Sequence, residues 1–168
     1  VRQATENVLA SQARPVVVVT GHEAERVRTA LAGLDVTFAH NPDYAQGLST
    51  SLRAGLSKFA GDVDGALVCL GDMPQVRAAQ LDALIAAFDP TEGHAICVPV
   101  VGGKRGNPVL WGAEFFAQIG SVAGDVGARH LIGENAEVLC EVPADGDGVL
   151  LDIDTPEALD AFRNRRSA

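Results

Sequence analysis

Two short and wholly apolar runs are the clearest elements of the chain. Residues 15–20 read PVVVVT and residues 65–70 read GALVCL, and a glycine follows each run. Continuous apolar runs of this length predict strands covered on both faces, as in a parallel sheet. After each run, apolar residues recur at helical spacing, over 22–34 and over 81–88. An amphipathic helix is therefore expected to follow each strand.

The rest of the pattern continues this alternation of strands and helices. After Pro90 the alternation of strand and helix stops. Two strand-like segments, 95–101 and 107–111, flank a glycine-rich turn, and this pattern predicts a pair of antiparallel strands. The other elements expected are helices over 1–9, 48–59, 114–119, 126–132 and 155–163, and strands over 35–39, 137–142 and 149–153. Together they predict a single α/β domain over residues 1–168, with a mostly parallel sheet and helices on both faces.

Composition narrows the classes of function. The chain has 168 residues, 47% of them hydrophobic, and no apolar run of 18 residues that could span a bilayer. The N-terminus also lacks the charged and apolar pattern of a secretion signal. We therefore expect a cytoplasmic protein without a membrane partner. A formal net charge of -9 with scattered basic residues argues against a nucleic-acid partner. A nucleotide remains possible as ligand, because a divalent metal supplies positive charge locally.

The three cysteines are odd in number and far apart in the chain. Cys69, Cys97 and Cys140 each stand among apolar neighbours. We therefore expect buried, reduced thiols rather than metal ligands.

One carboxylate directly follows the second apolar strand, in Gly71-Asp72-Met73-Pro74. Open α/β sheets bind their ligands at the carboxyl ends of the strands. Mg²⁺ needs few protein carboxylates, because it keeps waters and takes further oxygens from substrate phosphates. Asp72 is thus a candidate Mg²⁺ ligand. The alternative is that it caps the helix that follows Pro74.

A second acidic segment, Asp152-Ile153-Asp154-Thr155-Pro156-Glu157, also runs from an expected strand into a helix. Strand alternation puts Asp152 and Asp154 on one face. Asp154 and Glu157 also have the spacing of a capping box, and Pro156 suits a first helical turn. Capping is therefore the alternative function of Asp154. A metal site is favoured because two separate regions of the sequence each place an aspartate at the same edge of the expected sheet.

Cations and polar loops supply candidate binding groups. Lys104, Arg105 and Asn107 share a glycine-rich turn that could bring positive charge and backbone N–H groups to an anion, although a solvated turn explains them equally well. Arg129 falls one turn into the helix expected after Asp125. Asn41 and Ser49 belong to a polar loop that enters a helix, and a helix N-terminus accepts anions.

The order of these motifs resembles that of the molybdenum-cofactor cytidylyltransferases, within the MobA-like nucleotidyltransferases. The resemblance runs from about residue 1 to residue 165. It rests on Asn41-Pro42 with GLSTSL at 47–52, GDMP at 71–74, RGNPVL at 105–110, GDVGAR at 124–129 and DIDTPE at 152–157.

The resemblance implies a Rossmann-like nucleotidyltransferase fold and the Mg²⁺-dependent transfer of CMP from CTP to the phosphate of molybdopterin. Asp72 and Asp154 would be catalytic metal ligands, with Asp152 beside them. Gly71, Asn41 and Ser49 would lie near the nucleotide. Arg105, Asn107 and Arg129 would contact the acceptor, and a molybdoenzyme or its maturation chaperone would be a further partner.

One departure from that family concerns its phosphate loop. The family opens with a strand and a loop of the form LAAGxSxRMGxxK, whereas this chain opens with a helical pattern and contains neither GxGxxG nor GxxxxGK[ST]. We therefore expect an N-terminally incomplete domain that binds CTP poorly. Two alternatives stay open: a GTP-dependent or other nucleotidyltransferase of the same superfamily, and a non-catalytic α/β module.

Overall fold

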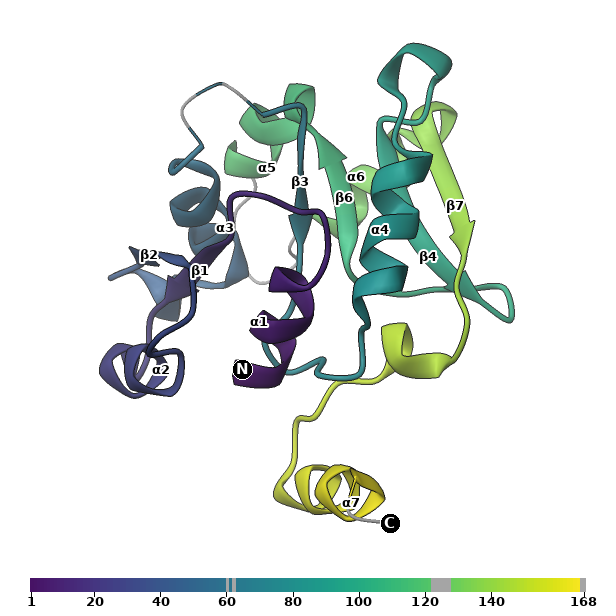
Figure 1. The fold of residues 1–168 in the computed structure, drawn as a ribbon. Helices are drawn as coiled ribbons and strands as arrows, with labels where there is room; N and C mark the ends of the chain where they lie inside the picture. Colours follow the sequence, from purple (N-terminus) through teal and green to yellow (C-terminus); the bar gives the residue numbers. More distant parts are fainter. Residues whose placement is uncertain (60, 62, 122–127, 167–168) are drawn as a thin grey trace.

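A computed structural model describes residues 1–59, 61, 63–121 and 128–166 (Figure 1). The helices are α1 (Arg2–Leu9), α2 (Ala24–Ala30), α3 (Leu48–Leu56), α4 (Ala78–Ala87), α5 (Phe116–Ser121), α6 (Arg129–Glu134) and α7 (Pro156–Arg166). The strands are β1 (Val17–Thr20), β2 (Thr37–His40), β3 (Gly65–Val68), β4 (Ile96–Val101), β5 (Lys104–Arg105), β6 (Val109–Gly112) and β7 (Leu139–Pro143). Short 3-10 helices include η1 (Tyr44–Gln46), η4 (Ala136–Val138) and η5 (Asp147–Leu150). No helix in the described ranges is long and apolar enough to cross a membrane.

The strands form two sheets. β1 and β2 pair in parallel, and the other sheet has the order β3-β6-β4-β5, with β7 paired to β4. β6 lies antiparallel to both β3 and β4, while β7 is parallel to β4. Consequently β3, β4 and β7 run in one direction, and only β5 and β6 oppose them. The expected mixed α/β fold with a small antiparallel excursion is confirmed.

Side chains of the larger sheet alternate between two apolar layers. On one face, Ile96 and Val98 of β4 pack with Trp111 of β6 and with residues of α5 and α6. On the other face, Cys97 and Leu110 pack against Leu84 of α4. β4 and β6 are therefore covered on both sides, whereas β3 and most of β1, the two runs expected to be covered on both faces, are only half-buried.

Three expectations need correction. Residues 149–153 do not form a strand, because Val149 and Leu150 close η5 and the following residues are extended without a ladder partner. The strand expected over 137–142 begins only at Leu139, after η4. Cys97 is buried and Cys140 half-buried, but Cys69 is exposed. The helix expected over 126–132 is described from Arg129 onward, and its first residues lie outside the described part of the chain.

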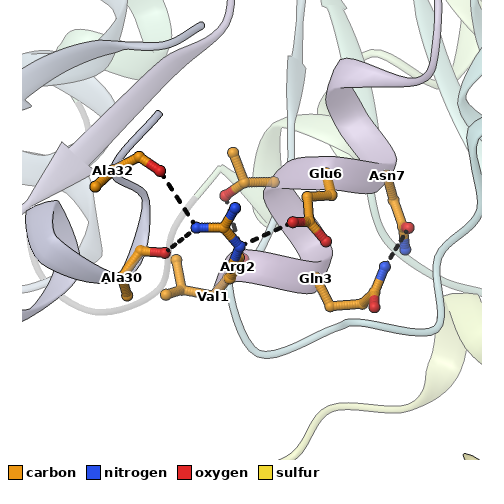
Figure 2. Close-up of polar contacts among 8 residues, drawn as sticks. Val1, Arg2, Gln3, Glu6, Asn7, Ala30 and Ala32 are labelled. Carbon is orange, nitrogen blue, oxygen red and sulfur yellow. Dashed lines mark hydrogen bonds and ion pairs between the residues drawn. The ribbon is translucent and has the colours of Figure 1, made fainter. Parts of the chain in front are cut away.

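Helix α1 joins the two sheets. The Arg2 guanidinium donates to the carbonyl oxygens of Ala30 and Ala32, at the end of α2, at 2.8 and 3.4 Å. Figure 2 shows this contact together with the Arg2–Glu6 ion pair. A cation at a helix C-terminus satisfies carbonyls that have no intrahelical partner. Arg2 thereby ties α1 to the unit formed by β1, α2 and β2.

Candidate active site

Asp72 lies in the turn that follows β3, and it is exposed. The main-chain carbonyl of Asp72 accepts the N–H of Ile153 at 2.9 Å. This hydrogen bond holds the segment after η5, which contains Asp152 and Asp154, beside the turn after β3, which contains Asp72. Asp152 and Asp154 are exposed on either side of the half-buried Ile153. Two regions far apart in the sequence therefore bring three aspartates to one edge of the sheet, as expected.

The carboxylates are close enough to interact electrostatically. The pKa of Asp154 is raised, first by the negative charge of Asp152, then by partial burial, and further by the charge of Asp72. Like charges that face one another destabilise the ionised form. The cluster therefore carries negative charge that favours a cation.

This repulsion has a predictable dependence on pH. The raised pKa means that the folded chain binds the Asp154 proton more tightly than the unfolded chain does, so this group's contribution to stability falls as pH rises above the ordinary aspartate range. We expect Asp152→Asn to raise the melting temperature slightly at pH 7 without metal, and to have no such effect at pH 2. Thermal melts of both proteins at the two pH values measure this. An equal shift at both would show that the charge of Asp152 is not the cause.

Helix capping does not account for these aspartates. The helix after Pro74 begins at Ala78, where the Arg77 N–H donates to Gln80 Oε1 at 2.8 Å, so Asp72 is too far upstream to cap it. At α7, the Ala158 N–H donates to Thr155 Oγ1 at 3.1 Å, so Thr155 caps that helix. Pro156 occupies the first helical position as predicted. Since other residues cap both helices, the functional interpretation of Asp72 and Asp154 gains support.

Asn107 lies against the segment that carries two of the aspartates. Its backbone N–H donates to the Val149 carbonyl at 2.8 Å. Next to it, Gly106 packs so closely that an added Cβ would stand 2.3 Å from the Val149 oxygen. The turn of the RGNP motif is thus fixed on η5, and only glycine permits that approach.

Two of the predicted cations, Lys104 and Arg105, are exposed at the hairpin of β4 and β5. Arg105 Nε forms an ion pair with Glu141 Oε1 of β7 at 2.7 Å, and Lys104 is exposed beside it. A half-exposed pair of this kind contributes little to stability and exchanges readily for another anion. Arg129 begins α6, and residues 124–127 of its motif lie outside the described part.

Asn41 follows β2 and Ser49 lies in the first turn of α3, and both are buried, with 2% and 1% of their surface exposed. The Asn41 amide donates to Thr50 Oγ1 and Ser51 Oγ at 2.8 and 3.0 Å, and its Oδ1 accepts the Asp43 N–H. Asn41 therefore joins the end of β2 to the first turn of α3. Gly71 stands next to Asp72 and against Val1, whose Cγ2 lies 3.6 Å from the position of an added Cβ.

A positioning residue that the motifs did not indicate is Asn7 of α1. Its Nδ2 donates to the carbonyls of Pro74 and Val76, at 3.0 and 2.7 Å, and Figure 2 shows its Oδ1 accepting from Gln3. Asn7 thus holds the turn that carries Asp72. The only feature of the sequence that could have indicated this role is a polar residue on the apolar face of an amphipathic helix.

The donor set fits a hard divalent cation. No group of three or more His, Cys, Asp or Glu side chains within the described ranges is placed so that it could hold a metal ion by itself. Mg²⁺ needs no such group, because it is held by one or two carboxylates with waters and substrate phosphates. Exposed aspartates that repel one another meet this requirement, and Asp72 with Asp154 or Asp152 would hold the ion.

Comparison with known proteins gives a consistent result. The MobA-like NTP transferase domain matches residues 1–138. The molybdenum cofactor cytidylyltransferase of Escherichia coli strain K12 is 29% identical over 145 residues, which cover 84% of this chain and 70% of the relative.

Solved structures agree with this match. A nucleotidyl transferase from Methanothermobacter superposes with a TM-score of 0.83 at 25% identity, over 99% of this chain and 80% of that one. A Mycobacterium tuberculosis protein in complex with manganese gives 0.77 at 25% identity, over 95% of this chain and 83% of that one. With the domain match over most of its length, the chain belongs to the MobA-like NTP transferase family.

Proposed function

We propose that the protein transfers CMP from CTP to the terminal phosphate of a molybdopterin-type cofactor, with release of pyrophosphate. The observation that carries this proposal is the Ile153–Asp72 backbone bond, which gathers Asp72, Asp152 and Asp154 at the carboxyl end of β3. The similarity to the E. coli molybdenum cofactor cytidylyltransferase supports the choice of substrates.

The transfer requires no protein nucleophile. A phosphate oxygen of the acceptor forms a bond to the α-phosphorus of CTP, while the bond from that phosphorus to the bridging oxygen breaks and pyrophosphate leaves. Bound Mg²⁺ would neutralise the phosphate charges. The role of Asp72 and Asp154 is to hold that charge at a fixed place, and Asn7 keeps the turn of Asp72 in position.

We also propose a role for each of the other predicted residues. Arg105 and Arg129 would contact the acceptor phosphate, and Asn107 would hold the RGNP turn on η5. For Arg105 this requires exchange of its ion pair with Glu141. Asn41 and Ser49, being buried, would act on the nucleotide by shaping the loop before α3 rather than by direct contact.

Base preference is tested with a version of the chain that carries the family's opening strand and LAAGxSxRMGxxK loop ahead of Val1. Transfer with molybdopterin is measured with CTP, GTP, ATP and UTP as competing donors, with Mg²⁺ present. We expect CTP to be used at least tenfold better than the others. Preference for GTP would replace the cytidylyltransferase assignment by a guanylyltransferase, and no transfer with any donor would support a non-catalytic module.

The 168-residue chain itself is expected to bind CTP weakly and to turn over little. Triphosphate binding needs several convergent cations or N–H groups, whereas Arg105 is paired with Glu141 at an exposed hairpin. Calorimetric titration with Mg²⁺-CTP, compared with the extended version, measures the difference, which we expect to be about a hundredfold or more. Efficient CMP transfer by the 168-residue chain would contradict this prediction.

A further inference from the structure

Two of the cysteines face each other across the parallel pair formed by β4 and β7. The register of this pair sets Cys97 directly opposite Cys140. Figure 1 shows β7 running alongside β4. Neighbouring strands of a sheet lie about 4.8 Å apart, and the Cα atoms of disulfide-linked cysteines lie about 4.4–6.8 Å apart. The spacing of the backbone therefore already suits a covalent bridge between these two residues.

The packing of neighbouring residues shows that both thiols point to the same face of the sheet. Ile96 and Leu139, one position earlier on each strand, pack in the core on the side of α5 and α6. Because side chains alternate along a strand, the next residues point the other way. Cys97 and Cys140 accordingly pack in the other core, with Leu84 of α4. A bridge requires this shared face, since diverging side chains cannot be joined without moving the backbone.

The two thiols also interact with each other. Burial is the main cause that raises the pKa of the Cys97 thiol to about 12, and the charge of Cys140 and a hydrogen bond to its side chain act in the same direction. The Cys97 thiol also donates to the His94 carbonyl oxygen, at 3.8 Å. Thiols are weak donors and weak acceptors, so an interaction between two of them requires that their sulfurs lie close together.

The two thiols differ in their access to solvent. Cys97 has 0% of its surface exposed, whereas Cys140 is half-buried. Oxidants react with thiols that are reachable and can lose their proton, and a thiol held protonated by burial reacts slowly. Cys140 is therefore the thiol that an oxidant meets first. Cys97 stands behind it, in the place of a resolving thiol.

The third cysteine cannot take part in this bridge. Cys69 directly follows β3, and the order of the sheet places β6 between β3 and β4. Two strand spacings amount to about 10 Å, and cysteines whose Cα atoms are more than about 7 Å apart cannot be joined without moving the backbone. Cys97 and Cys140 are thus the pair of cysteines that the backbone places for an intramolecular disulfide.

We propose that Cys97 and Cys140 form a redox modification site, at which an oxidant of the peroxide class converts the two thiols into a reversible disulfide between β4 and β7. The sulfur of Cys140 attacks one oxygen of the peroxide, the O–O bond breaks, and Cys140 becomes a sulfenic acid as water leaves. The sulfur of Cys97 then bonds to that of Cys140, the S–O bond breaks, and the Cys97 proton leaves with the oxygen as a second water. The two thiols lose two electrons, and these reduce the peroxide.

The bridge closes a long loop of the chain. The residues between the two cysteines include the RGNP turn and α6, and β7 is followed by η5, onto which Asn107 is hydrogen-bonded. Closing a loop of about forty residues restricts the unfolded chain and thereby stabilises the folded one. The oxidised protein is therefore expected to be the more stable form. This inference concerns the thiols and does not depend on the proposed function.

The test treats Cys69→Ser, which keeps only the facing pair, with hydrogen peroxide at neutral pH. Mass spectrometry after proteolysis should find the peptides of Cys97 and Cys140 joined, with the loss of two hydrogens, and separate again after reduction. The melting temperature without reductant should rise by about 5–15 °C on oxidation and return to its starting value on reduction. Thiols that stay unreacted, or a linked protein with an unchanged melting temperature, would contradict the proposal.

Two further variants, each made in the Cys69→Ser protein, separate the alternatives. Cys140→Ser changes a half-buried position, so it should fold, and it should show no rise in melting temperature with peroxide. In Cys97→Ala the sulfenic acid of Cys140 has no resolving thiol, so its trapping by a 1,3-diketone reagent should increase about tenfold or more. Disulfides that join two copies of the chain, or oxidation of Cys140 to a sulfinic acid without any link, would overturn the proposal.

Discussion

Replacing Asp72 with asparagine is expected to lower the affinity for Mn²⁺ or Mg²⁺ by about tenfold to a hundredfold, because the variant loses a charged ligand of the proposed metal site. The fold should survive. The Asp72 side chain is exposed and caps no helix, and its main-chain carbonyl still accepts the Ile153 N–H. Removing its charge also relieves a smaller part of the repulsion that raises the pKa of Asp154, of which the charge of Asp152 is the main cause.

Metal binding and stability are therefore expected to move in opposite directions. Mn²⁺ titration measures the affinity, and thermal melting without metal should give an unchanged or slightly higher melting temperature. In the version with the phosphate loop, transfer from CTP should fall about a hundredfold or more. Asp35→Asn, an exposed aspartate in the loop before β2, is the matched control and should change none of these quantities.

Normal metal affinity in Asp72→Asn would remove Asp72 from the site. The same measurement on Asp154→Asn and Asp152→Asn ranks the three ligands. If only Asp152 and Asp154 matter, the metal site lies in the segment after η5 alone, and the Ile153–Asp72 bond is structural.

Gly106→Ala is expected to destabilise the protein by about 1–3 kcal/mol, the usual cost of forcing an extra carbon into a packed site. The added Cβ would lie 2.3 Å from the carbonyl oxygen of Val149 and 2.9 Å from its carbonyl carbon, so no side-chain rotation can relieve the clash. Val149 itself is buried beneath α4 with Leu81 and Met73. Urea denaturation measures the change in the free energy of unfolding.

The same substitution should disturb the candidate site. A shift of Val149 strains its bond to the Asn107 N–H and moves the segment that leads to Asp152. We expect weaker Mn²⁺ binding in Gly106→Ala at temperatures where it is still folded. Gly133→Ala is the control, because that glycine lies in α6 with open space around it, and alanine there should stabilise by about 0.5–1 kcal/mol. Equal stability of the two variants would show that the contact at Gly106 relaxes without cost.

The sequence by itself determined the class of fold and indicated a candidate site. The runs PVVVVT and GALVCL are apolar at every position, which predicts strands, and the structure has β1 and β3 there. Aspartates directly after an apolar run indicated a ligand-binding edge, because parallel strands end together. These are local rules, and the residues that obey them are adjacent in the chain.

Only the tertiary structure decided how separate segments meet. Capping by Thr155 and by Gln80, rather than by the aspartates, depends on where the helices begin, and sequence patterns fix helix ends poorly. Residues 149–153 look like a strand because they are mostly apolar, yet the Asn107 N–H takes up the Val149 carbonyl and no ladder forms. The insertion of β6 between β3 and β4 and the hydrogen bonds of Asn7 to the turn after Asp72 both arise from contacts between segments far apart in the chain. A pattern of apolar residues states that a strand is buried, but it does not state which neighbour buries it.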